Sequence, residues 1–573
     1  MIQILKAKNG LDTLLIDGRY IHSAYRPDSD GANVRLDKHK LYILFGVGLG
    51  YMAANIIRNN PGASLIIFEP LSELADKFRS AYHSILHSSS VLLITEIEYD
   101  PIYNFINEQA DYGSKRIEFI STPYCDIMSD TANAVLESIR KIYEIYVQNL
   151  FTRSNFAQLW TRNHIYNLAM LPQVPLCRID RDSDLSDNLA VIVGAGPTLD
   201  REWDNLTNLR QQLTIICVDT AIKPLLRHSI MPDFIMTLDG QIYSLDDFTA
   251  FIPSESYIIS EMTSYHQINR GYNNVKFVMN YDKTDNFAKY FLRIADSPID
   301  ETAANADEYF IPISGTVADF ALKFAAAVGF RHIALLGIDL SYPQICTHAR
   351  HTPAYNKLWS SADYFATLDT QNARIISARK LTTVHNKNGG ETLSDFVLSH
   401  YADGFSGFAA VHPDISLYNI ISDGADIRFV QNISLIELTS RLSTKCQQQY
   451  IASHILHDSK ISSDSINKAQ QSVLQQVYQY SERLKTLYAQ TDWTDVSSLR
   501  EWDSLTGQLY ADLPFMRDFV IMQNVIHARQ TDSDPLNELS YYRNAGFILL
   551  QACYFVVRTL QKAISFCTSS ATE

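Results

Sequence analysis

Residues 191–204 read VIVGAGPTLDREWD, an apolar run that breaks into Gly-Ala-Gly-Pro and then becomes acidic. A strand followed by a glycine-rich turn and a helix is typical of α/β folds in which the turn meets a phosphate. Glycine allows the backbone to approach a ligand closely, and the amides at a helix start attract an anion. This stretch therefore predicts one strand-turn-helix unit of a parallel α/β domain.

The flanking sequence divides the chain into four expected domains. Residues 189–430 alternate helical patterns with short apolar runs such as LAVIV, LTIICV, FIMTL and HIALLG, which favours a parallel sheet. Residues 1–130 contain LYILFGVGLG and SLIIFEP, which predict a Rossmann-like domain. Residues 131–188 have a helical period and form a connector, and residues 431–573 lose the strand patterns and are expected to be all-helical. The fold class is therefore α/β with a helical C-terminal domain.

Composition excludes several classes of protein. The 573 residues are 46% hydrophobic, which suits folded domains, and the formal charge of -15 argues against nucleic acid or an anionic membrane as a partner. The seven scattered cysteines suggest neither a zinc site nor a disulfide framework. The N-terminus does not resemble a secretory signal, and the late apolar stretch AGFILLQACYFVV is too short to cross a bilayer. We expect a cytoplasmic protein that neither spans nor binds a membrane.

The N-terminal turn GVGLG allows two interpretations. Gly46, Gly48 and Gly50 follow a strand, and Glu69 ends the next apolar run at the distance where a ribose hydroxyl is often bound. That pattern suits NAD or S-adenosylmethionine. The same glycines would also suit a tight strand-to-helix turn in a domain without a cofactor, and no catalytic set accompanies them.

The central turn differs from a dinucleotide fingerprint. Its third glycine is missing, and Pro197 removes an amide that a pyrophosphate would use. Gly194 and Gly196 remain free to approach a ligand, Thr198 offers a hydroxyl, and Asp200 is placed to cap the following helix. We expect a specialised phosphate-binding turn rather than ordinary NAD binding.

Other segments place polar residues where strands end. Because the carboxyl ends of parallel strands share one edge of the sheet, we expect these residues to gather beside the central turn. Ser314, Gly315 and Thr316 open a helix of small residues and predict a second anion cradle. The further candidates at strand ends and on the loop that follows the last of these strands are Asp219, Thr220, Asp239, Gln241, Gly337, Asp339, Tyr342, His348 and His351.

In order and spacing, these motifs resemble the Maf family, the motility-associated factors that glycosylate bacterial flagellins. The motifs are GAGPTLD, VDTAIKPLLRHSIMPDFIMTLDGQ, ISGTVADFALKFAAAVGFRHIALLGIDLSY, THARH and LYNIISDGADI, within roughly residues 130–430. The upstream FGVGLGY, IIFEP and WTRNHIYNLAMLPQV also resemble that family. The sequence departs from the family pattern with Thr198 in place of Ser, Ile338 in place of Gln and Ser422-Asp423 in place of Glu-Gly.

The resemblance implies a cytoplasmic glycosyltransferase whose central domain is similar to bacterial sialyltransferases. Such an enzyme transfers a nonulosonic acid, of the pseudaminic or legionaminic type, from CMP to Ser or Thr hydroxyls of flagellin, and flagellum assembly and motility need this modification. The donor substrate would be a CMP-nonulosonic acid and the partner flagellin. No obligatory cofactor or metal is expected, because one phosphate needs less neutralisation than a diphosphate.

The resemblance also suggests roles for the candidates. The central turn with Asp219 and Asp239 would hold the cytidine and ribose phosphate, largely through backbone amides, and Tyr342 would donate to the leaving phosphate. His348 is the first choice for the general base that deprotonates the acceptor, and His351 is the second. Both histidines could instead decorate a surface loop, and His385 and His412 are weaker alternatives.

Other functions stay open at the level of sequence. A related central domain occurs in a pterin pyrophosphokinase group that would use ATP and Mg²⁺, and a third possibility is a non-catalytic flagellin chaperone. The C-terminal helices either pack within the chain or recruit flagellin. The sequence leaves open which sugar is used, which flagellin residues are modified and the oligomeric state.

Overall fold

The computed structural model describes residues 2–37, 40–86, 90–109, 116–280, 286–295, 308–312, 315–420, 423–442, 446–491, 499–516 and 538–570. The chain divides into two compact units. The first comprises Met1–Ala157 and Val520–Glu538, and the second comprises Gln158–Phe519 and Leu539–Glu573. This division falls inside one helix, α6 (Ser129–Ala169), which covers much of the expected connector. It also places the expected central and C-terminal domains in one unit.

The first unit contains a parallel sheet of Rossmann type and a small antiparallel sheet. The antiparallel sheet consists of β1 (Ile2–Lys6), β2 (Asp12–Ile16) and β3 (Arg19–Tyr20), and the parallel sheet of β4 (Lys40–Phe45), β5 (Ser64–Phe68), β6 (Val91–Ile94) and β7 (Arg116–Ile120). The helices are α1 (Tyr51–Asn59), α2 (Ser72–Ala81), α3 (His83–Leu86), α4 (Tyr99–Gln109), α5 (Pro123–Ile127) and the first part of α6. The parallel order β6-β5-β4-β7 is that of half a doubly wound sheet.

The second unit is built on a sheet of eleven strands among the described residues, in the order β19-β18-β15-β9-β10-β11-β12-β13-β8-β20, with β14 beside β13. These strands are β8 (Leu176–Ile179), β9 (Leu185–Val193), β10 (Thr214–Val218), β11 (Phe234–Thr237), β12 (Tyr257–Glu261), β13 (Val275–Asn280), β14 (Phe310–Ile311), β15 (Phe330–Leu336), β18 (Ser416–Ile420), β19 (Gln431–Ile433) and β20 (Leu456–Ser459). Every pair is parallel except β20 with β8. The expected α/β fold class is confirmed.

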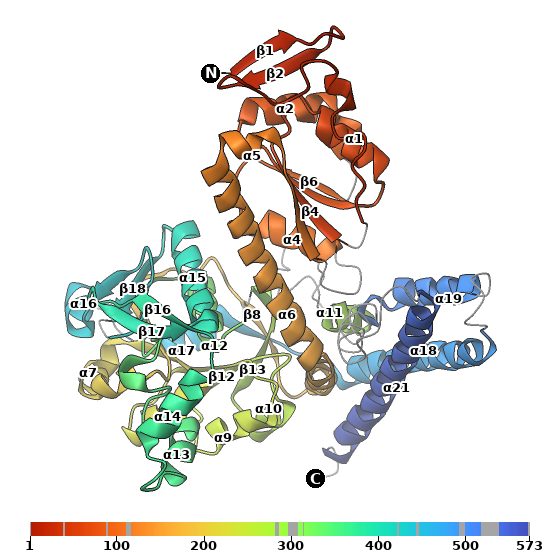
Figure 1. Cartoon of the computed structure of the whole chain (residues 1–573). Coiled ribbons are helices and arrows are strands. Elements are labelled where there is room, and N and C mark those ends of the chain that lie inside the picture. Colours follow the sequence, from red (N-terminus) through yellow and green to blue (C-terminus); the bar gives the residue numbers. More distant parts are fainter. Residues whose placement is uncertain are drawn as a thin grey trace. The chain divides into compact units, whose positions relative to one another are not determined.

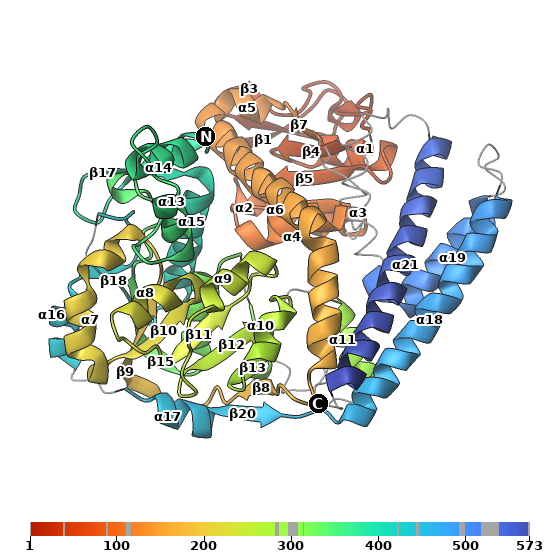
Figure 2. The ribbon, with the colours of Figure 1, turned by 90° about the horizontal axis from the view of Figure 1, so that it is seen from below.

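The strand order fixes where a ligand would bind. From β9 the chain moves through β10 and β11 in one direction, then returns to place β15, β18 and β19 on the other side of β9. Figure 2 shows β10, β11, β12 and β13 following one another in the first of these directions. The topological switch point is therefore between β9 and β15, and in open α/β sheets ligands bind at the carboxyl ends of strands beside that point. The glycine-rich turn at residues 194–196 and the Gly337–Asp339 segment follow these two strands directly.

Helices and one hairpin surround this sheet. The helices up to β15 are α7 (Trp203–Leu209), α8 (Ile222–Arg227), α9 (Leu245–Phe248), α10 (His266–Gly271), α11 (Asn286–Ile294) and α12 (Val317–Ala327). After β15 follow α13 (Pro353–Ser360), α14 (Leu368–Ser377), the hairpin strands β16 (Leu381–His385) and β17 (Glu391–Asp395), and then α15 (Phe396–Val411), α16 (Leu435–Leu442) and α17 (Gln448–Tyr450). The apolar α12 packs under β9, β10, β11 and β15, and its phenylalanines are part of the main core (Figure 1).

The last part of α6 clamps two loops of the second unit. Asn163 Nδ2 donates to the carbonyls of Gly240 and Thr263, at 2.9 and 3.0 Å. One turn further on, Asn167 Nδ2 donates to the carbonyls of Met262 and Ser264, at 2.8 and 2.9 Å. The polar residues of WTRNHIYN therefore fix the loops that follow β11 and β12.

The C-terminal region is helical but contributes two strands to the sheet. The helices are α18 (Ser463–Gln490), α19 (Leu499–Asp512) and α21 (Glu538–Ser570), which lie together in both views (Figures 1 and 2). The expectation that strands cease near residue 431 is wrong, because β19 and β20 follow it. Both are short, polar edge strands, and such strands lack the apolar alternation that identifies a strand in a sequence.

Helix α21 (Glu538–Ser570) extends well beyond the apolar stretch AGFILLQACYFVV that it contains. Ala545–Ser565 is long and apolar enough to span a membrane by length and composition, and 56% of its apolar window is buried inside the protein. The expectation that this segment is too short to cross a bilayer is therefore wrong, because the apolar helix is longer than the stretch recognised in the sequence. Its buried positions Leu549, Cys553, Val556 and Leu560 recur at three- and four-residue steps, as in a helix packed along one face.

Candidate functional site

The glycine-rich turn and the end of β15 are joined by hydrogen bonds. The amide of Gly194 donates to the carbonyl of Leu336 and that of Gly196 to the carbonyl of Gly337, each at 2.8 Å. A Cβ on Gly194 would lie 2.6 Å from the Gly337 oxygen, and one on Gly196 would overlap the carboxylate of Asp339. The two glycines are therefore required by the close approach of two protein segments.

Asp339 holds the residue that follows the turn. Its buried carboxylate accepts the Thr198 amide at 2.9 Å and the Thr198 hydroxyl. The hydroxyl of Thr198 thus has a structural partner. The expectation that the amides of Gly194, Gly196 and Thr198 hold a phosphate needs correction, because each already donates within the protein.

The segment after the turn differs from the expected helix cap. Pro197 begins a short 3-10 helix that ends at Arg201, and α7 starts later, at Trp203. Asp200 does not cap α7; its carboxylate accepts the Arg350 amide at 3.1 Å. Asp200 therefore ties this segment to the loop that carries His348 and His351.

His348 lies beside the switch point. The next residue, Ala349, donates its amide to the carbonyl of Ala195 at 2.9 Å, so the loop is docked on the glycine-rich turn. The Nδ1 atom of His348 is buried and has no hydrogen-bond partner among the described residues. Burial and the nearby Arg379 lower the pKa of His348. A neutral imidazole of this kind can accept a proton at physiological pH.

Tyr342 is buried, and its hydroxyl donates to Asp395 Oδ2 at 2.5 Å. Burial and the bond to Asp395 raise the pKa of this hydroxyl. Asp395 also caps α15 by accepting the Leu398 amide at 2.9 Å. The expectation that Tyr342 donates to the leaving phosphate needs correction, because its proton already has a protein acceptor.

The positively charged Arg379 lies near Asp395 and Tyr401, and Tyr401 lies beside Gly315 of the second expected anion cradle. Arg379 lies 3.7 Å from Asp395 and also influences His348 and Tyr401. Gly315, with a φ of +87°, lies against the Tyr401 ring, and Thr316 caps α12 by accepting the Asp319 amide at 3.0 Å. Ser314 lies outside the described residues. Arg379 therefore lies near the start of α15, where it is paired with Asp395.

Two carboxyl groups lie at the ends of β10 and β11. The buried Asp219 accepts the Thr220 amide at 2.9 Å and the Thr237 hydroxyl at 3.1 Å. Burial raises the pKa of Asp219 to about 7. Asp239 is exposed and accepts the Gln241 amide at 2.9 Å. These four predicted residues therefore share the expected edge of the sheet.

Sequence reasoning missed three residues of this region. Asp247 on α9 is buried, and burial with the charge of Asp219 raises its pKa to about 8. Lys387, in the turn between β16 and β17, is influenced by Asp339 and Asp426, and burial lowers its pKa to about 8. Arg379 is the third. An Asp pair on a short helix and a basic residue near a hairpin look like solvated surface in a sequence, so no signal identified them.

The remaining histidines lie elsewhere. The ring of His351 is 5.9 Å from that of His228, which stacks on Trp203 at 4.0 Å, so His351 faces α7 and α8 rather than Arg379. His385 is exposed on β16. His412 follows the last residue of α15 and lies against Phe408, at the opposite end of that helix from Asp395.

In the part of the chain that the structure describes, no three His, Cys, Asp or Glu side chains are arranged to hold a metal ion. The acids Asp219, Asp239 and Asp339 follow different strands, and Asp247 lies on α9. The absence of an obligatory metal or cofactor stays a prediction.

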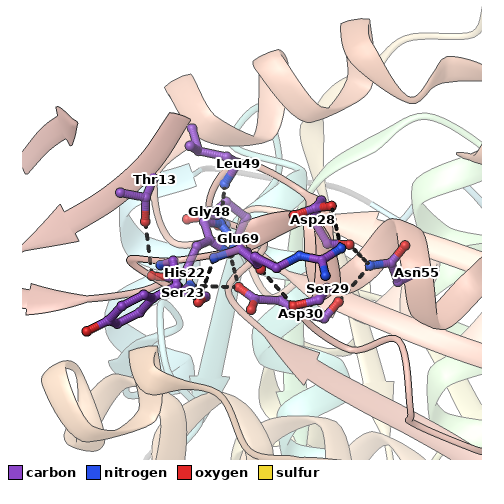
Figure 3. A network of polar contacts seen from close by, with 12 residues as sticks. Thr13, His22, Ser23, Asp28, Ser29, Asp30, Gly48, Leu49, Asn55 and Glu69 are labelled. Atoms are coloured by element: carbon purple, nitrogen blue, oxygen red, sulfur yellow. Dashed lines mark hydrogen bonds and ion pairs between the residues drawn. The ribbon is translucent and has the colours of Figure 1, made fainter. Parts of the chain in front are cut away.

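The N-terminal turn is closed by its own side chains (Figure 3). Glu69 Oε2 accepts the amides of Val47 and Gly48, at 2.7 and 3.1 Å. His22 Nε2 accepts the Leu49 amide at 2.7 Å, and its Nδ1 lies 3.1 Å from Asp30. The acid that would bind a ribose is fully buried and faces the turn. This geometry favours a structural turn over a cofactor site.

The fold is that of a doubly wound α/β domain, with the glycine-rich turn at its topological switch point. A family model described as 6-hydroxymethylpterin diphosphokinase MptE-like matches residues 162–344, from the end of α6 to just beyond β15.

The whole chain is similar in fold to a solved structure, that of the Maf glycosyltransferase from Magnetospirillum magneticum AMB-1. The match has a TM-score of 0.56 and 14% sequence identity, and it covers 99% of this chain and 92% of that one. An uncharacterized protein of Treponema pallidum (strain Nichols) is 21% identical over 469 residues, which is 78% of this chain and 77% of that protein. A second uncharacterized protein of the same organism is 25% identical over 175 residues, 30% of this chain and 75% of that protein.

Proposed function

We propose that this protein is a glycosyltransferase that transfers a nonulosonic acid, of the pseudaminic or legionaminic type, from CMP to Ser or Thr hydroxyls of flagellin. The observation that carries the proposal is the fold match to a Maf glycosyltransferase over 99% of the chain. The site agrees with it, because a histidine loop is docked on the turn at the switch point. Flagellum assembly and motility would depend on this activity, which we assign to the cytoplasm.

The chemistry requires one bond exchange. The acceptor oxygen attacks the anomeric carbon of the sugar, the bond from that carbon to the phosphate oxygen breaks, and CMP leaves with the bonding electrons. His348 accepts the proton of the acceptor hydroxyl. The transition state has oxocarbenium character, and negative charge develops on the phosphate as the bond breaks. A positive charge near the leaving phosphate therefore lowers the barrier.

The leaving phosphate needs partners other than the turn amides, which are already occupied. Arg379, near the start of α15, supplies a charge that is always present, because the guanidinium does not titrate at physiological pH. Lys387 supplies a second cation close to Asp339. We assign phosphate or sugar carboxylate binding to Arg379, Lys387, Gly315 and Thr316.

The helical C-terminal region would recruit the acceptor. Its described surface exposes Tyr478 and Tyr554, about half of each residue. Deleting everything beyond residue 431 is a poor test, because it removes β20, which pairs with β8. We expect Tyr478→Ser with Tyr554→Ser to reduce flagellin capture without changing CMP affinity; undiminished capture would exclude this surface.

A second candidate is a pterin diphosphokinase, which the family match to residues 162–344 favours. Calorimetric titration of the full chain with CMP and, separately, with ATP and hydroxymethylpterin distinguishes the two. The glycosyltransferase proposal expects binding of CMP. Binding of ATP and the pterin in its place would contradict it.

A further inference from the structure

Three large aromatic side chains project into solvent from the segment between β15 and β16. Trp359 is 64% exposed, and Tyr364 and Phe365 are each 90% exposed. Trp359 lies in the last turn of α13, and the other two lie in the turn that joins α13 to α14, where their rings meet edge to face with centroids 5.3 Å apart. We call these three residues the aromatic tip. Large apolar side chains that are exposed together are typical of a surface that binds a partner.

Hydrogen bonds fix the backbone of the turn that carries the tip. Asp363 Oδ1 accepts the amides of Phe365 and Ala366, at 2.8 and 2.7 Å. From α14, Gln371 Nε2 donates to the Ala366 carbonyl at 2.9 Å, and Gln371 Oε1 accepts the Ser361 hydroxyl at 3.0 Å. The rings therefore project from a turn that is already ordered, which lowers the entropy cost of binding a partner.

The chain leads from the candidate site to the tip and back again. On the way out, the Ala349 amide docks the loop of His348 on the Ala195 carbonyl at 2.9 Å, and α13 begins shortly after this contact. On the way back, Asn372 of α14 accepts the amide and the hydroxyl of Thr347, at 3.2 and 2.9 Å. Both helices are thus anchored to the loop that carries the proposed general base.

The length of α13 indicates which substrate reaches the tip. Helix α13 has eight residues and is therefore about 12 Å long, and it lies beside α14 in both views (Figures 1 and 2). An extended polypeptide covers this distance with about four residues. In the proposed function the donor lies at the carboxyl edge of the sheet, so the substrate that extends from His348 to the tip is the acceptor chain.

The charges around the tip argue against other macromolecules. Between residues 353 and 377 the two acids Asp363 and Asp369 are balanced by the two bases Lys357 and Arg374. Nucleic acids and anionic membranes are bound by clustered basic residues, and the chain as a whole has a formal charge of -15. Aromatic side chains with balanced charges are instead typical of a contact with protein.

We propose that the aromatic tip binds apolar side chains of the acceptor polypeptide, about four residues along the chain from the hydroxyl that is modified. The inference rests on the proposed transfer to a protein acceptor. The C-terminal surface would capture flagellin as a whole, whereas the tip would select which hydroxyl reaches His348. A contact that is equally strong in the bound substrate and in the transition state affects KM rather than kcat.

The test is the rate of sugar transfer by the full-length protein as a function of flagellin concentration. We expect Tyr364→Ser with Phe365→Ser to raise the KM for flagellin about tenfold or more and to leave kcat within about threefold of the wild type. Calorimetric affinity for CMP and the temperature of thermal unfolding should not change, because both side chains are exposed. Tyr364→Phe with Phe365→Tyr keeps both rings and should retain the wild-type KM.

The matched control is Phe251→Ser, which removes a ring that is 86% exposed between α9 and β12. It should leave the KM for flagellin unchanged. An unchanged KM in the double serine variant, or an equal rise in the control, would overturn the inference and leave the proposed function intact. Analytical ultracentrifugation of the same proteins gives a further outcome: a wild-type dimer that dissociates in the double serine variant would assign the tip to contact with a second copy and overturn the inference. Absence of transfer by the wild type would overturn the proposed function.

Discussion

His348 is the side chain on which the proposed chemistry depends. We expect His348→Ala to lower the turnover rate by about 10²- to 10⁴-fold, the usual contribution of a general base, and to change CMP affinity little. Because the pKa of His348 is lowered below its ordinary value of 6.5, the acid limb of the wild-type rate profile should lie below pH 6.5. Rates of sugar transfer measured against pH check both statements.

The matched control is His351→Ala. His351 faces His228 and the α7–α8 side, so its loss should leave the rate within a few-fold of the wild type. A large fall in the rate of sugar transfer in His351→Ala, with a nearly unchanged rate in His348→Ala, would instead identify His351 as the general base. If neither variant lost activity, the protein would use another base.

Tyr342 has a structural role by our account. Tyr342→Phe removes the hydroxyl that donates to the buried Asp395, and we expect it to reduce the free energy of unfolding by about 1–3 kcal/mol. Urea unfolding measures this loss. A large fall in turnover with unchanged stability would instead restore Tyr342 as the donor to the leaving phosphate.

The carboxyl of Asp247 also affects stability. Its pKa is raised from 3.8 to about 8, so the folded protein binds a proton more readily than the unfolded chain. The stability associated with that proton is complete below about pH 4 and is lost as the pH rises to about 8. We expect Asp247→Asn to stabilise the protein more at pH 9 than at pH 5, by an amount on the order of a few kcal/mol. Thermal unfolding at the two pH values tests this, and an equal effect at both would contradict the raised pKa.

The turn after β9 and the end of β15 act as one element. Gly196→Ala would place a methyl group against the Asp339 carboxylate, so we expect a loss of about 1–3 kcal/mol in stability and a weaker affinity for CMP. Gly271→Ala is the control, because nothing lies within 4 Å of a Cβ at that position. Thermal unfolding measures the loss of stability in each variant, and calorimetry measures its affinity for CMP. The control shows whether any glycine-to-alanine change has these effects or only the change at Gly196. Normal CMP binding by Gly196→Ala would show that the nucleotide does not depend on this junction.

At the level of elements, much of the fold follows from the sequence. The apolar runs of β9, β10, β11 and β15 are buried on both faces and are readily recognised. The strands β19 and β20 escape recognition because their polar edge positions show no alternation. The glycine-rich turn was located correctly, but its partners were not, since hydrogen bonds such as that from Gly196 to Gly337 join segments more than 140 residues apart.

The molecule as a whole combines the eleven-stranded sheet of the second unit with a Rossmann-type parallel sheet in the first unit and a helical C-terminal region. In the first unit, Glu69 and His22 accept the amides of Val47, Gly48 and Leu49 in the GVGLG turn, which favours a structural role for that turn. In the second unit, sequence motifs located the sheet edge and His348, whereas Arg379, Lys387 and Asp247 emerged only from tertiary packing. Burial and charge decide their roles, and neither is visible in a linear sequence.

The central claim is sugar transfer to a protein hydroxyl, and the intact mass of flagellin tests it most directly. Purified protein is incubated with flagellin and a CMP-nonulosonic acid, with His348→Ala in parallel. We predict that flagellin gains the mass of one or more nonulosonic acid residues with the wild-type protein and gains none with His348→Ala. An unchanged flagellin mass, together with transfer of a diphosphate from ATP to hydroxymethylpterin, would contradict the account.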